Sequence, residues 1–454
     1  MTTARGNAAS GSSLTDLTAQ LDRDLAASDA ALVQDYLGDR GVRQPLHTVY
    51  VPGDQYDADL VSRWGARAAE SLAENGPDAA SFAAATGVDA TLMEDLYPRI
   101  VDKLEREPIE DLRIDFEDGF GDQGDEVEDA SVIAAARALT ASLEAGTAAP
   151  FHGIRFKSFE TATRHRGLRT LDAFVGEMAR AEAIGDGFLL TLPKVTAIEQ
   201  VAAMATACDW LEDTYALPAG RLGFEIQVET PQSIIGMDGT VAVSRMIQAA
   251  AGRCTGLHYG TYDYSASCGI AAEYQSMEHP AADFAKSFMQ VSSAGTGVFV
   301  SDGSTNILPV GDTSAVRGAW ALHARLVRRS LERGFYQGWD LHPAQLPTRY
   351  AATFAFYRDG FDVAAARLLA YTGGGDSQYM DEPATATALA GFVLRGVECG
   401  AVSEAEATRA SGNDRAALGR LAKRRGHDAS TSSNPASSDQ ACNEQAPSDE
   451  APGE

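Results

Sequence analysis

The sequence predicts a (β/α)8 barrel, the TIM-barrel fold, followed by a helical extension, and three observations lead to this prediction. Short runs rich in β-branched and aromatic residues alternate with longer, Ala-rich stretches of helical period. Eight such runs occur, and most are separated by segments long enough for helical crossovers between parallel strands. The alternative of a doubly wound open sheet is disfavoured because no GxGxxG motif follows the first run.

The eight predicted strands are followed by segments of helical period. The strands are expected at residues 46–51, 111–118, 152–159, 187–195, 223–230, 255–263, 297–302 and 338–343. Further helices are expected over Ala344–Tyr371, Ala384–Cys399 and Ser403–Lys423. A glycine run at 372–376 separates the first two of these helices, and it indicates either a hinge or a plain linker.

These elements divide the chain into four parts. Residues 14–345 form the predicted barrel domain, and residues 346–425 form the C-terminal helical extension. Residues 1–13 are small and polar, and residues 426–454 form an acidic tail with almost no bulky apolar side chain. Neither end has enough apolar surface to pack, so both termini are expected to be disordered.

Composition excludes several classes of function. The chain has 454 residues, 44 % of them hydrophobic, and a formal net charge of −27. A chain this acidic is not expected to bind nucleic acid or anionic membranes. There is neither an apolar run of membrane-spanning length nor a secretory signal, and the five cysteines show no metal-binding spacing. We therefore expect a cytoplasmic protein with reduced thiols.

Charged side chains stand at the ends of most predicted strands. In a barrel the catalytic groups lie at the carboxyl ends of the strands, so these positions are the candidates for a site. They are Asp115, Glu117, Asp118, Arg155, Lys157, Lys194, Glu229, Asp263, Asp302, Asp340 and His342. Asp302 is better explained by a turn, because Gly303 follows it.

Glu229 and Asp263 end adjacent predicted strands and form the sharpest candidate pair. Mg²⁺ takes one or two protein carboxylates, keeps waters and leaves positions for substrate oxygens. No set of His and Cys residues indicates a softer metal. The alternative for Glu229 is a contact with the dipole of a helix that begins at Thr230–Pro231, and the spacing alone leaves both interpretations open.

Seven motifs at the strand ends resemble those of the citrate lyase beta-subunit-like (HpcH/HpaI aldolase/citrate lyase) family of the phosphoenolpyruvate/pyruvate barrel superfamily. In chain order they are VYVPGD, DFEDGFG, GIRFKS, LPKV, QVETP, YGTYDYSAS and DLHPAQL, between about residues 46 and 345. YGTYDY, together with YMDEPATATAL at 379–389, also resembles malate synthases. The resemblance implies a metal-dependent (β/α)8 barrel.

The resemblance also implies roles for particular residues. Glu229 and Asp263 match the carboxylates that bind Mg²⁺ or Mn²⁺, and Arg155 matches an arginine that meets the oxygens of the substrate. Glu117 and Asp118 match an acidic pair that holds metal-bound water and neighbouring cations.

Four further positions match motif residues of the family. Gly260 and Thr261 fall where backbone amides receive the carboxylate of a 2-oxo acid. Lys194 and His342 are expected to support the substrate-binding site rather than to react, with Lys194 paired to a carboxylate of the strand ends.

The condensing members of the superfamily use an acidic residue of a C-terminal segment as a base, and Asp381 or Glu382 matches that position. The start of an Ala-rich helix at Pro383 explains the same residues without catalysis.

The predicted function is a Mg²⁺-dependent carbon–carbon lyase, related to aldolases and citrate lyase. It would act on a 2-oxo acid or a hydroxyacyl-CoA adduct through a metal-stabilised enolate. The alternatives are a malate synthase-like condensation of glyoxylate with an acyl-CoA, and a barrel that binds a metabolite without turnover. No CoA-binding signature is recognisable, and the resemblance implies a homo-oligomer, a trimer or hexamer.

Overall fold

The computed structural model describes residues 13–373 and 381–424. The predictions of disorder for the two termini fall almost entirely on residues outside these ranges. Within them, eight parallel strands form one sheet in the order β7-β6-β5-β4-β3-β2-β1-β8. The strands are β1 (His47–Pro52), β2 (Asp111–Asp115), β3 (Phe151–Arg155), β4 (Phe188–Leu192), β5 (Gly223–Val228), β6 (Cys254–Tyr259), β7 (Phe299–Ser301) and β8 (Gly338–Asp340).

A parallel bridge between Ser301 and Gln337 joins β7 to the start of β8 and nearly closes the sheet into a barrel. The predicted (β/α)8 barrel is therefore confirmed, and the open sheet is wrong. All eight strands lie close to their predicted positions, but most are shorter, because the polar residues that follow them belong to the loops. Those loops contain the candidate site.

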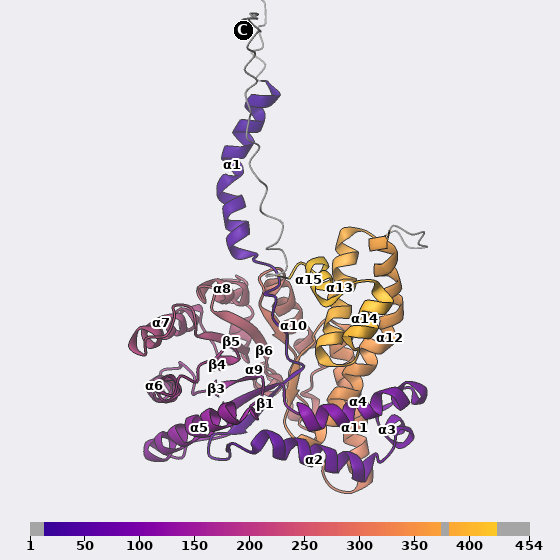
Figure 1. Cartoon of the computed structure of the whole chain (residues 1–454). Coiled ribbons are helices and arrows are strands. Elements are labelled where there is room, and N and C mark those ends of the chain that lie inside the picture. The colour runs from indigo at the N-terminus through magenta and orange to yellow at the C-terminus, as the bar shows by residue number, and fades with distance from the viewer. Residues whose placement is uncertain (1–12, 374–380, 425–454) are drawn as a thin grey trace, which may run out of the picture.

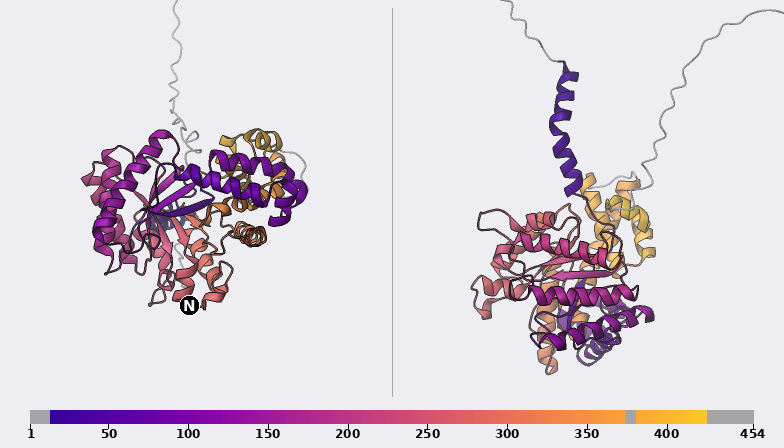
Figure 2. Two further views of the ribbon diagram at one scale, coloured as in Figure 1. Left: turned by 90° about the horizontal axis from the view of Figure 1, so that it is seen from below. Right: turned by 90° about the vertical axis from the view of Figure 1, so that its left-hand side faces the viewer.

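Helices surround the barrel (Figures 1 and 2). Three of them, α2 (Leu60–Asn75), α3 (Ala79–Thr86) and α4 (Ala90–Arg106), fill the long connection between β1 and β2. The later crossovers contain α5 (Asp125–Ala145), α6 (Arg164–Arg180), α7 (Ile198–Thr214), α8 (Ala242–Ala249), α9 (Thr261–Ser267), α10 (Pro280–Ser293) and α11 (Thr313–Glu332). Three short 3-10 helices are η1 (Pro231–Ser233), η2 (Ala272–Tyr274) and η3 (Pro343–Gln345).

The chain after β8 forms four helices beside the barrel. They are α12 (Leu346–Gly373), α13 (Pro383–Cys399), α14 (Glu404–Ser411) and α15 (Arg415–Leu421). The single helix expected over 403–423 is in fact two, because Gly412 adopts a left-handed φ of 70° and Asp414 caps a new helix through the amide of Ala417. The first of these helices, α12, begins at residue 346, the predicted start of the C-terminal helical extension.

One helix lies apart from all the others. α1 (Leu14–Asp35) has no buried residue and projects away from the body of the molecule, as Figure 1 and the right panel of Figure 2 show. The prediction had included these residues in the barrel domain.

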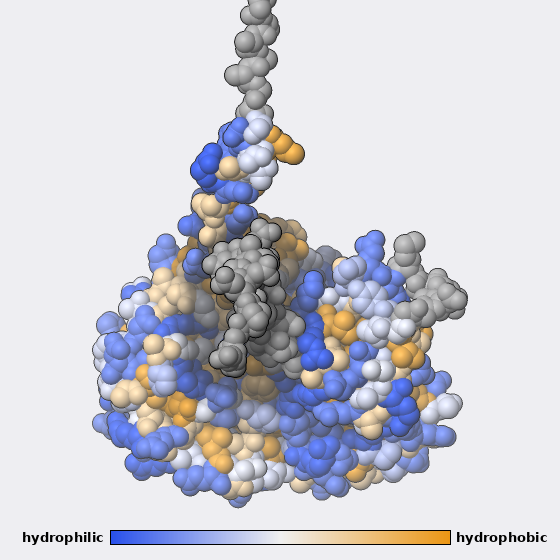
Figure 3. All heavy atoms as spheres, turned by 45° about the horizontal axis from the view of Figure 1, so that its top comes forward, coloured by the Kyte–Doolittle hydropathy of each residue, from blue (hydrophilic) through white to orange (hydrophobic). Residues whose placement is uncertain are grey.

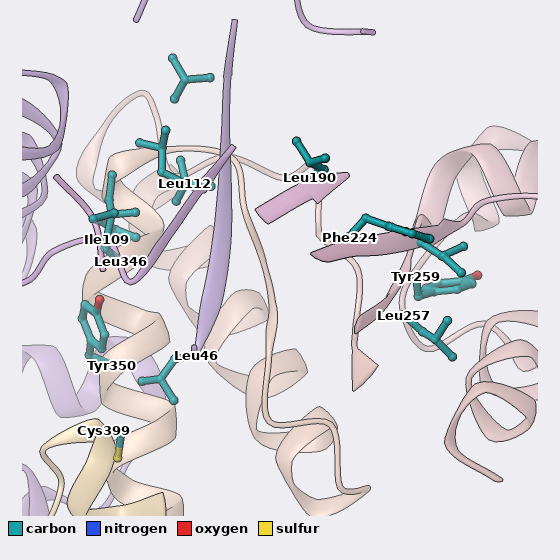
Figure 4. Close-up of a cluster of buried hydrophobic side chains, with 14 of the residues drawn as sticks. Leu46, Ile109, Leu112, Leu190, Phe224, Leu257, Tyr259, Leu346, Tyr350 and Cys399 are labelled. Carbon is teal, nitrogen blue, oxygen red and sulfur yellow. The ribbon is translucent and has the colours of Figure 1, made fainter. Parts of the chain in front are cut away.

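The strands of the barrel separate an apolar core on their outer side from a polar interior. Outward-facing strand residues such as Leu112, Leu190 and Phe224 pack with the helices, including Leu346 and Tyr350 of α12 (Figure 4). The barrel interior is polar, because the alternate residues of the same strands are charged. Arg113 Nη2 lies 2.8 Å from Glu225 Oε2, and the hydroxyl of Thr191 donates to Glu225 Oε1 at 2.6 Å.

None of the described helices is long and apolar enough to cross a lipid bilayer.

Asp340 is a buried anchor between the barrel and α12. Its carboxylate lies 3.0 Å from His47 Nδ1, 3.1 Å from His323 Nε2 and 2.8 Å from Arg349 Nη2, and none of the four residues is more than 4 % exposed. Arg349 lowers the pKa of Asp340 well below its usual range, although burial opposes this shift. The carboxylate is therefore charged in the folded protein.

We expect Asp340→Asn to lower the free energy of unfolding by about 3–5 kcal/mol, because Arg349 would keep a buried charge without its partner. Chemical denaturation measures this. The control is Glu278→Gln, which breaks the exposed pair with Arg325 and should cost less than about 1 kcal/mol. Equal losses in the two variants would contradict the anchoring role.

Candidate active site

Arg155 is the last residue of β3, and its guanidinium is fixed by a carboxylate on the neighbouring strand. Asp115 is its register partner at the end of β2. Arg155 Nε donates to Asp115 Oδ1 at 2.7 Å and Nη2 donates to Oδ2 at 2.6 Å, a planar two-pronged pair. Nη1 has only longer contacts, 3.5 Å to Gln227 Oε1 and 3.7 Å to Glu117 Oε2. Nη1 is therefore the donor left for a ligand.

Tyr50 of β1 supports this guanidinium from one face. Its ring centroid lies 4.6 Å from Arg155 Cζ, and its hydroxyl accepts a hydrogen bond from Gln227 Nε2 at 3.3 Å. Sequence reasoning did not select Tyr50 or Gln227 as site residues, and it selected Asp115 only as a charged strand end, without a role. Strand alternation could have indicated Gln227 and Tyr50. Side chains two residues apart on a strand face the same side, and these residues stand two before the motif positions Glu229 and Pro52, respectively.

Lys194, which follows β4, joins the acidic loop after β2 to the strand ends. Its Nζ lies 2.6 Å from Glu117 Oε1 and 2.5 Å from Asp118 Oδ2. Burial lowers the pKa of Lys194, but these two carboxylates outweigh burial and the net pKa is raised. Lys194 therefore remains a cation and cannot serve as a base. Its predicted pairing with a carboxylate of the strand ends is what the structure shows.

The backbone of Lys194 is also unusual. Its φ of 49° lies in the left-handed region, which costs a non-glycine residue about 1 kcal/mol or more. This conformation accompanies a hydrogen bond from the Lys194 amide to Glu229 Oε2 at 3.0 Å. The carboxylate of Glu229 is thus directed toward the end of β4. This hydrogen bond of Glu229 runs to the neighbouring loop rather than to its own helix start at η1, and the metal-binding role of Glu229 stays a prediction.

Glu229 is almost completely buried, with 1 % exposure. Its pKa is raised to about 7: burial is the largest cause, Asp263 and Glu117 also raise it, and Arg155 and Lys194 oppose the rise. The carboxylate of Glu229 therefore has two other carboxylates and two cations around it. At neutral pH the site therefore has a shortage of positive charge beside Glu229.

Asp263 approaches Glu229 from the next strand. It lies in the first turn of α9, directly after β6, and is half-buried. The two strands are paired up to Val228 and Tyr259, just before these residues. Gly260 makes the approach possible, because a Cβ there would lie 2.4 Å from Glu229 Cγ and 2.8 Å from Glu229 Oε1.

The donor set fits a hard divalent cation. Among the described residues no group of three or more His, Cys, Asp or Glu side chains could hold a metal ion. Two neighbouring carboxylates are instead the ligand number that Mg²⁺ uses when water and substrate oxygens complete its coordination. A cation at this place would also neutralise the buried charge of Glu229.

The amides of Gly260 and Thr261, predicted to bind the carboxylate of the substrate, differ in whether they already have an acceptor. The Gly260 amide donates to the carbonyl of Val228 at 3.0 Å, so it is already used. The Thr261 amide opens α9, where the first-turn amides have no acceptor within the helix. The hydroxyl of Thr261 accepts from the Ser304 amide at 3.2 Å, which ties the α9 start to the loop after β7.

Two of the predicted site residues, His342 and Glu382, do not contact the group of side chains around Glu229 in the structure. His342 caps η3 by accepting from the Ala344 amide at 3.2 Å, and burial together with the charge of Arg67 lowers its pKa. Glu382 precedes α13 and is exposed. Its neighbour Asp381 forms an ion pair with Arg367 of α12.

The course of α12 places Asp381 and Glu382 at the opposite end of the barrel from Glu229. α12 starts beyond β8, at the carboxyl ends, and Tyr357 lines a cavity with Leu46 and Glu110, which precede β1 and β2. Arg367 lies about 15 Å farther along the helix axis. The chain is not bent back toward the site, and the helix start at Pro383 accounts for the acidic residues.

Comparison with known proteins places the chain in a family. It belongs to the family of the domain of unknown function DUF6986, whose model matches residues 25–426. No curated protein matches it. A citrate lyase from Burkholderia xenovorans LB400 is similar in structure at 17 % identity, with 81 % of this chain and 96 % of that chain covered and a TM-score of 0.53.

Two other solved structures are more distant. The malate synthase of Haloferax volcanii with glyoxylate is 13 % identical, with 69 % and 76 % of the chains covered and a TM-score of 0.44. Protein CitE of Mycobacterium tuberculosis, in complex with magnesium, acetoacetate and coenzyme A, is 17 % identical, with 78 % and 98 % covered and a TM-score of 0.44. The first of the three likenesses supports the barrel fold, and the activity of this chain is a separate question.

We expect Gly260→Ala to weaken the binding of Mn²⁺ or Mg²⁺ at least about tenfold, because the new methyl group displaces the Glu229 carboxylate. Isothermal titration calorimetry measures this. Gly318→Ala in α11 is the matched control, since a Cβ there meets nothing within 4 Å. Unchanged affinity in Gly260→Ala would separate Glu229 from metal binding.

Proposed function

We propose that this chain is a divalent-metal-dependent carbon–carbon lyase, with Mg²⁺ or Mn²⁺ bound by Glu229 and Asp263. The observation that supports this most is that these two carboxylates follow adjacent strands at their carboxyl ends, where Glu229 is buried and the charges of Asp263 and Arg155 both act on its pKa. The motif resemblance and the place of the site on the fold agree with it. The substrate class is a 2-oxo acid or a hydroxyacyl-CoA adduct.

The residues of the chain supply most of the recognition. A divalent ion held here would act as a Lewis acid toward the keto and carboxylate oxygens of the substrate. Arg155 Nη1 would donate to an oxygen of the substrate and stabilise the negative charge that develops when the carbon–carbon bond breaks. Asp115 and Tyr50 hold the guanidinium plane for this task. The amide of Thr261 is placed to meet the substrate carboxylate.

Proton transfer falls to the acidic loop after β2. Burial raises the pKa of Glu117, against the opposing charges of Arg155 and Lys194, so this carboxyl binds a proton more readily than a free glutamate does. Burial acts the same way on Asp118, but the hydrogen bond from Lys194 prevails and lowers its pKa. Glu117 is therefore the preferred proton donor or acceptor, and Asp118 keeps Lys194 in place.

The alternative of a malate synthase-like condensation is less well supported. It requires a base that removes a proton from the acyl-CoA methyl group, and the acidic residues assigned to it lie with α12 and α13, Asp381 being paired with Arg367. The proposal therefore favours cleavage.

A substrate screen tests the activity itself. Small 2-oxo acids and hydroxyacyl-CoA thioesters are incubated with the protein, with Mg²⁺ or with a chelator, and the products are analysed for pyruvate, oxaloacetate, acetyl-CoA and free CoA. We expect metal-dependent cleavage that Asp263→Asn abolishes. Tight, metal-dependent binding of a 2-oxo acid without any turnover would instead support a barrel that only binds a metabolite.

We expect Arg155→Lys to lower kcat/KM at least about 100-fold, because a point charge replaces neither the two-pronged pair with Asp115 nor the directed Nη1–H group. Steady-state kinetics on the substrate found by the screen measure this. Arg137→Lys is the control, since Arg137 lies on the surface with 71 % of its side chain exposed. Equal rates in wild type and Arg155→Lys would remove Arg155 from the site.

The pKa of Glu229 near 7 in the metal-free protein predicts a pH dependence of metal affinity. Mg²⁺ binds the ionised carboxylate, so a bound proton must leave, and the affinity should fall about tenfold per pH unit below about 6. Calorimetry over a pH series measures this.

The stability of the metal-free protein provides a control, because it should change with pH in the opposite direction to the metal affinity. Because folding raises the pKa of Glu229 from 4.5 to about 7, its ionisation costs folded-state stability as pH rises. The free energy of unfolding of the wild type should therefore fall relative to that of Glu229→Gln between about pH 5 and about pH 8. A constant difference would mean that Glu229 is ionised throughout.

A further inference from the structure

The projecting helix α1 has a single narrow apolar face. Its five leucines are separated by three, four, four and seven residues, so all of them lie on one side of the helix. They are 46–79 % exposed, and no residue of the helix is buried. Figure 3 shows apolar residues of this helix at the molecular surface. The leucine stripe consists of Leu14, Leu17, Leu21, Leu25 and Leu32.

The attachment of α1 to the body directs this stripe away from its own chain. The Gly38 amide donates to the carbonyl of Gly295 at 2.7 Å, and Arg424 Nε lies 3.3 Å from Asp39 Oδ2. The ring of Tyr36 packs beside Gly295. These contacts fix the base of the helix, so folding α1 back onto the same chain would require breaking them. Most of the stability of a helix in a protein comes from packing of its apolar face, so the exposed stripe indicates a partner molecule.

The charge of α1 restricts that partner. The helix contains five aspartates and one arginine, and the aspartates at 22, 24, 29 and 35 flank the leucine stripe on both sides. Pairing α1 with the α1 of another copy would bring ten aspartates together against two arginines. An acidic helix is better matched by an apolar surface with arginines beside it.

Such a surface exists on α10 and α11 of the same chain. On α10, Phe284 is 49 % and Val291 78 % exposed, and the ring of Phe288 packs tilted against that of Phe284, with centroids 4.8 Å apart. The spacing 284, 288, 291 makes these residues a second stripe on one helical face. Arg329 and Arg333 of the α11 segment stand beside it, because both contact Asp283, at 2.6 and 2.9 Å.

We propose that α1 of one copy of this chain docks along the α10 face of a second copy, and that the exchange is reciprocal. The leucine stripe then covers Phe284, Phe288 and Val291, and the flanking aspartates meet the partly exposed guanidinium groups of the α11 segment. α10 ends next to the base of α1, since Gly295 contacts both Gly38 and Tyr36, so the interface continues from the arm onto the body.

The dimensions agree with a stable dimer. A helix of 22 residues is about 33 Å long and about 10 Å wide, enough to span the whole of α10. One docked arm buries roughly 600 Å² in total, and two reciprocal arms bury on the order of 1,200 Å², the lower limit for a specific interface. A two-fold pair is also the commonest arrangement that leaves no open end.

Light scattering coupled to size-exclusion chromatography of the full chain tests the proposal. The wild type should be oligomeric, and Leu17→Glu/Leu21→Glu should lower its mass at least twofold. Ala19→Glu/Ala26→Glu is the matched control: it adds the same charge on the opposite face of α1 and should leave the mass unchanged. Because no residue of α1 is buried, these variants report association rather than folding.

The second surface is tested by Phe284→Glu/Val291→Glu, with circular dichroism to establish that the variant is folded. Loss of mass in this variant as well as in Leu17→Glu/Leu21→Glu supports docking of α1 on α10. A monomeric wild type, or an unchanged mass in Leu17→Glu/Leu21→Glu, overturns the proposal. An unchanged mass in the folded α10 variant overturns α10 as the receiving face and points to pairing between two α1 helices.

Discussion

The structure of the candidate site depends on the burial of one carboxylate. Glu229 directly follows β5 at the ring of strand ends with 1 % exposure, and its pKa is raised to about 7, with burial as the largest cause. A lone buried anion is unfavourable, so its surroundings must compensate for it. Here the Lys194 amide donates to it, Arg155 and Lys194 supply positive charge, and Asp263 and Glu117 add negative charge. A divalent cation bound here would resolve this imbalance, which supports the proposed metal site.

The polar interior of the barrel supports the same site from below. Arg113, Thr191 and Glu225 form a buried hydrogen-bonded layer, and the hydroxyl of Tyr50 lies 3.4 Å from Glu225 Oε1. Tyr50 in turn contacts Arg155 and Gln227 at the level of the site. Satisfied polar layers of this kind have defined geometry but little tolerance for loss of a partner. The orientation of Arg155 is thus determined by residues on several strands.

The sequence predicted the barrel well because each strand pattern is local. The alternation of apolar runs and helical segments was enough to locate all eight strands, and motif positions at their ends indicated Arg155, Glu117, Lys194 and Glu229, which the structure brings together. Tyr50 and Gln227 were missed, and Asp115 was given no role, because the roles of all three depend on which residues face each other across strands. That register is set by the closure of the barrel.

Other features depended on distant parts of the chain and were therefore beyond local patterns. The position of Asp381 and Glu382 follows from the length and direction of α12, which carries them past the amino ends of the strands. The separate course of α1 follows from the contacts of Gly38 and Asp39 with residues far along the chain. A stretch of helical period shows that a helix forms, and tertiary contacts decide where it lies.

The most direct test of the central claim is a crystal structure of the protein with Mn²⁺, in which anomalous scattering locates the ion. The account predicts one strong peak within coordination distance of a carboxylate oxygen of Glu229 and of Asp263, on the side of the site that Arg155 Nη1 faces. A peak bound to other residues, or no peak at a concentration that saturates binding in solution, would contradict it.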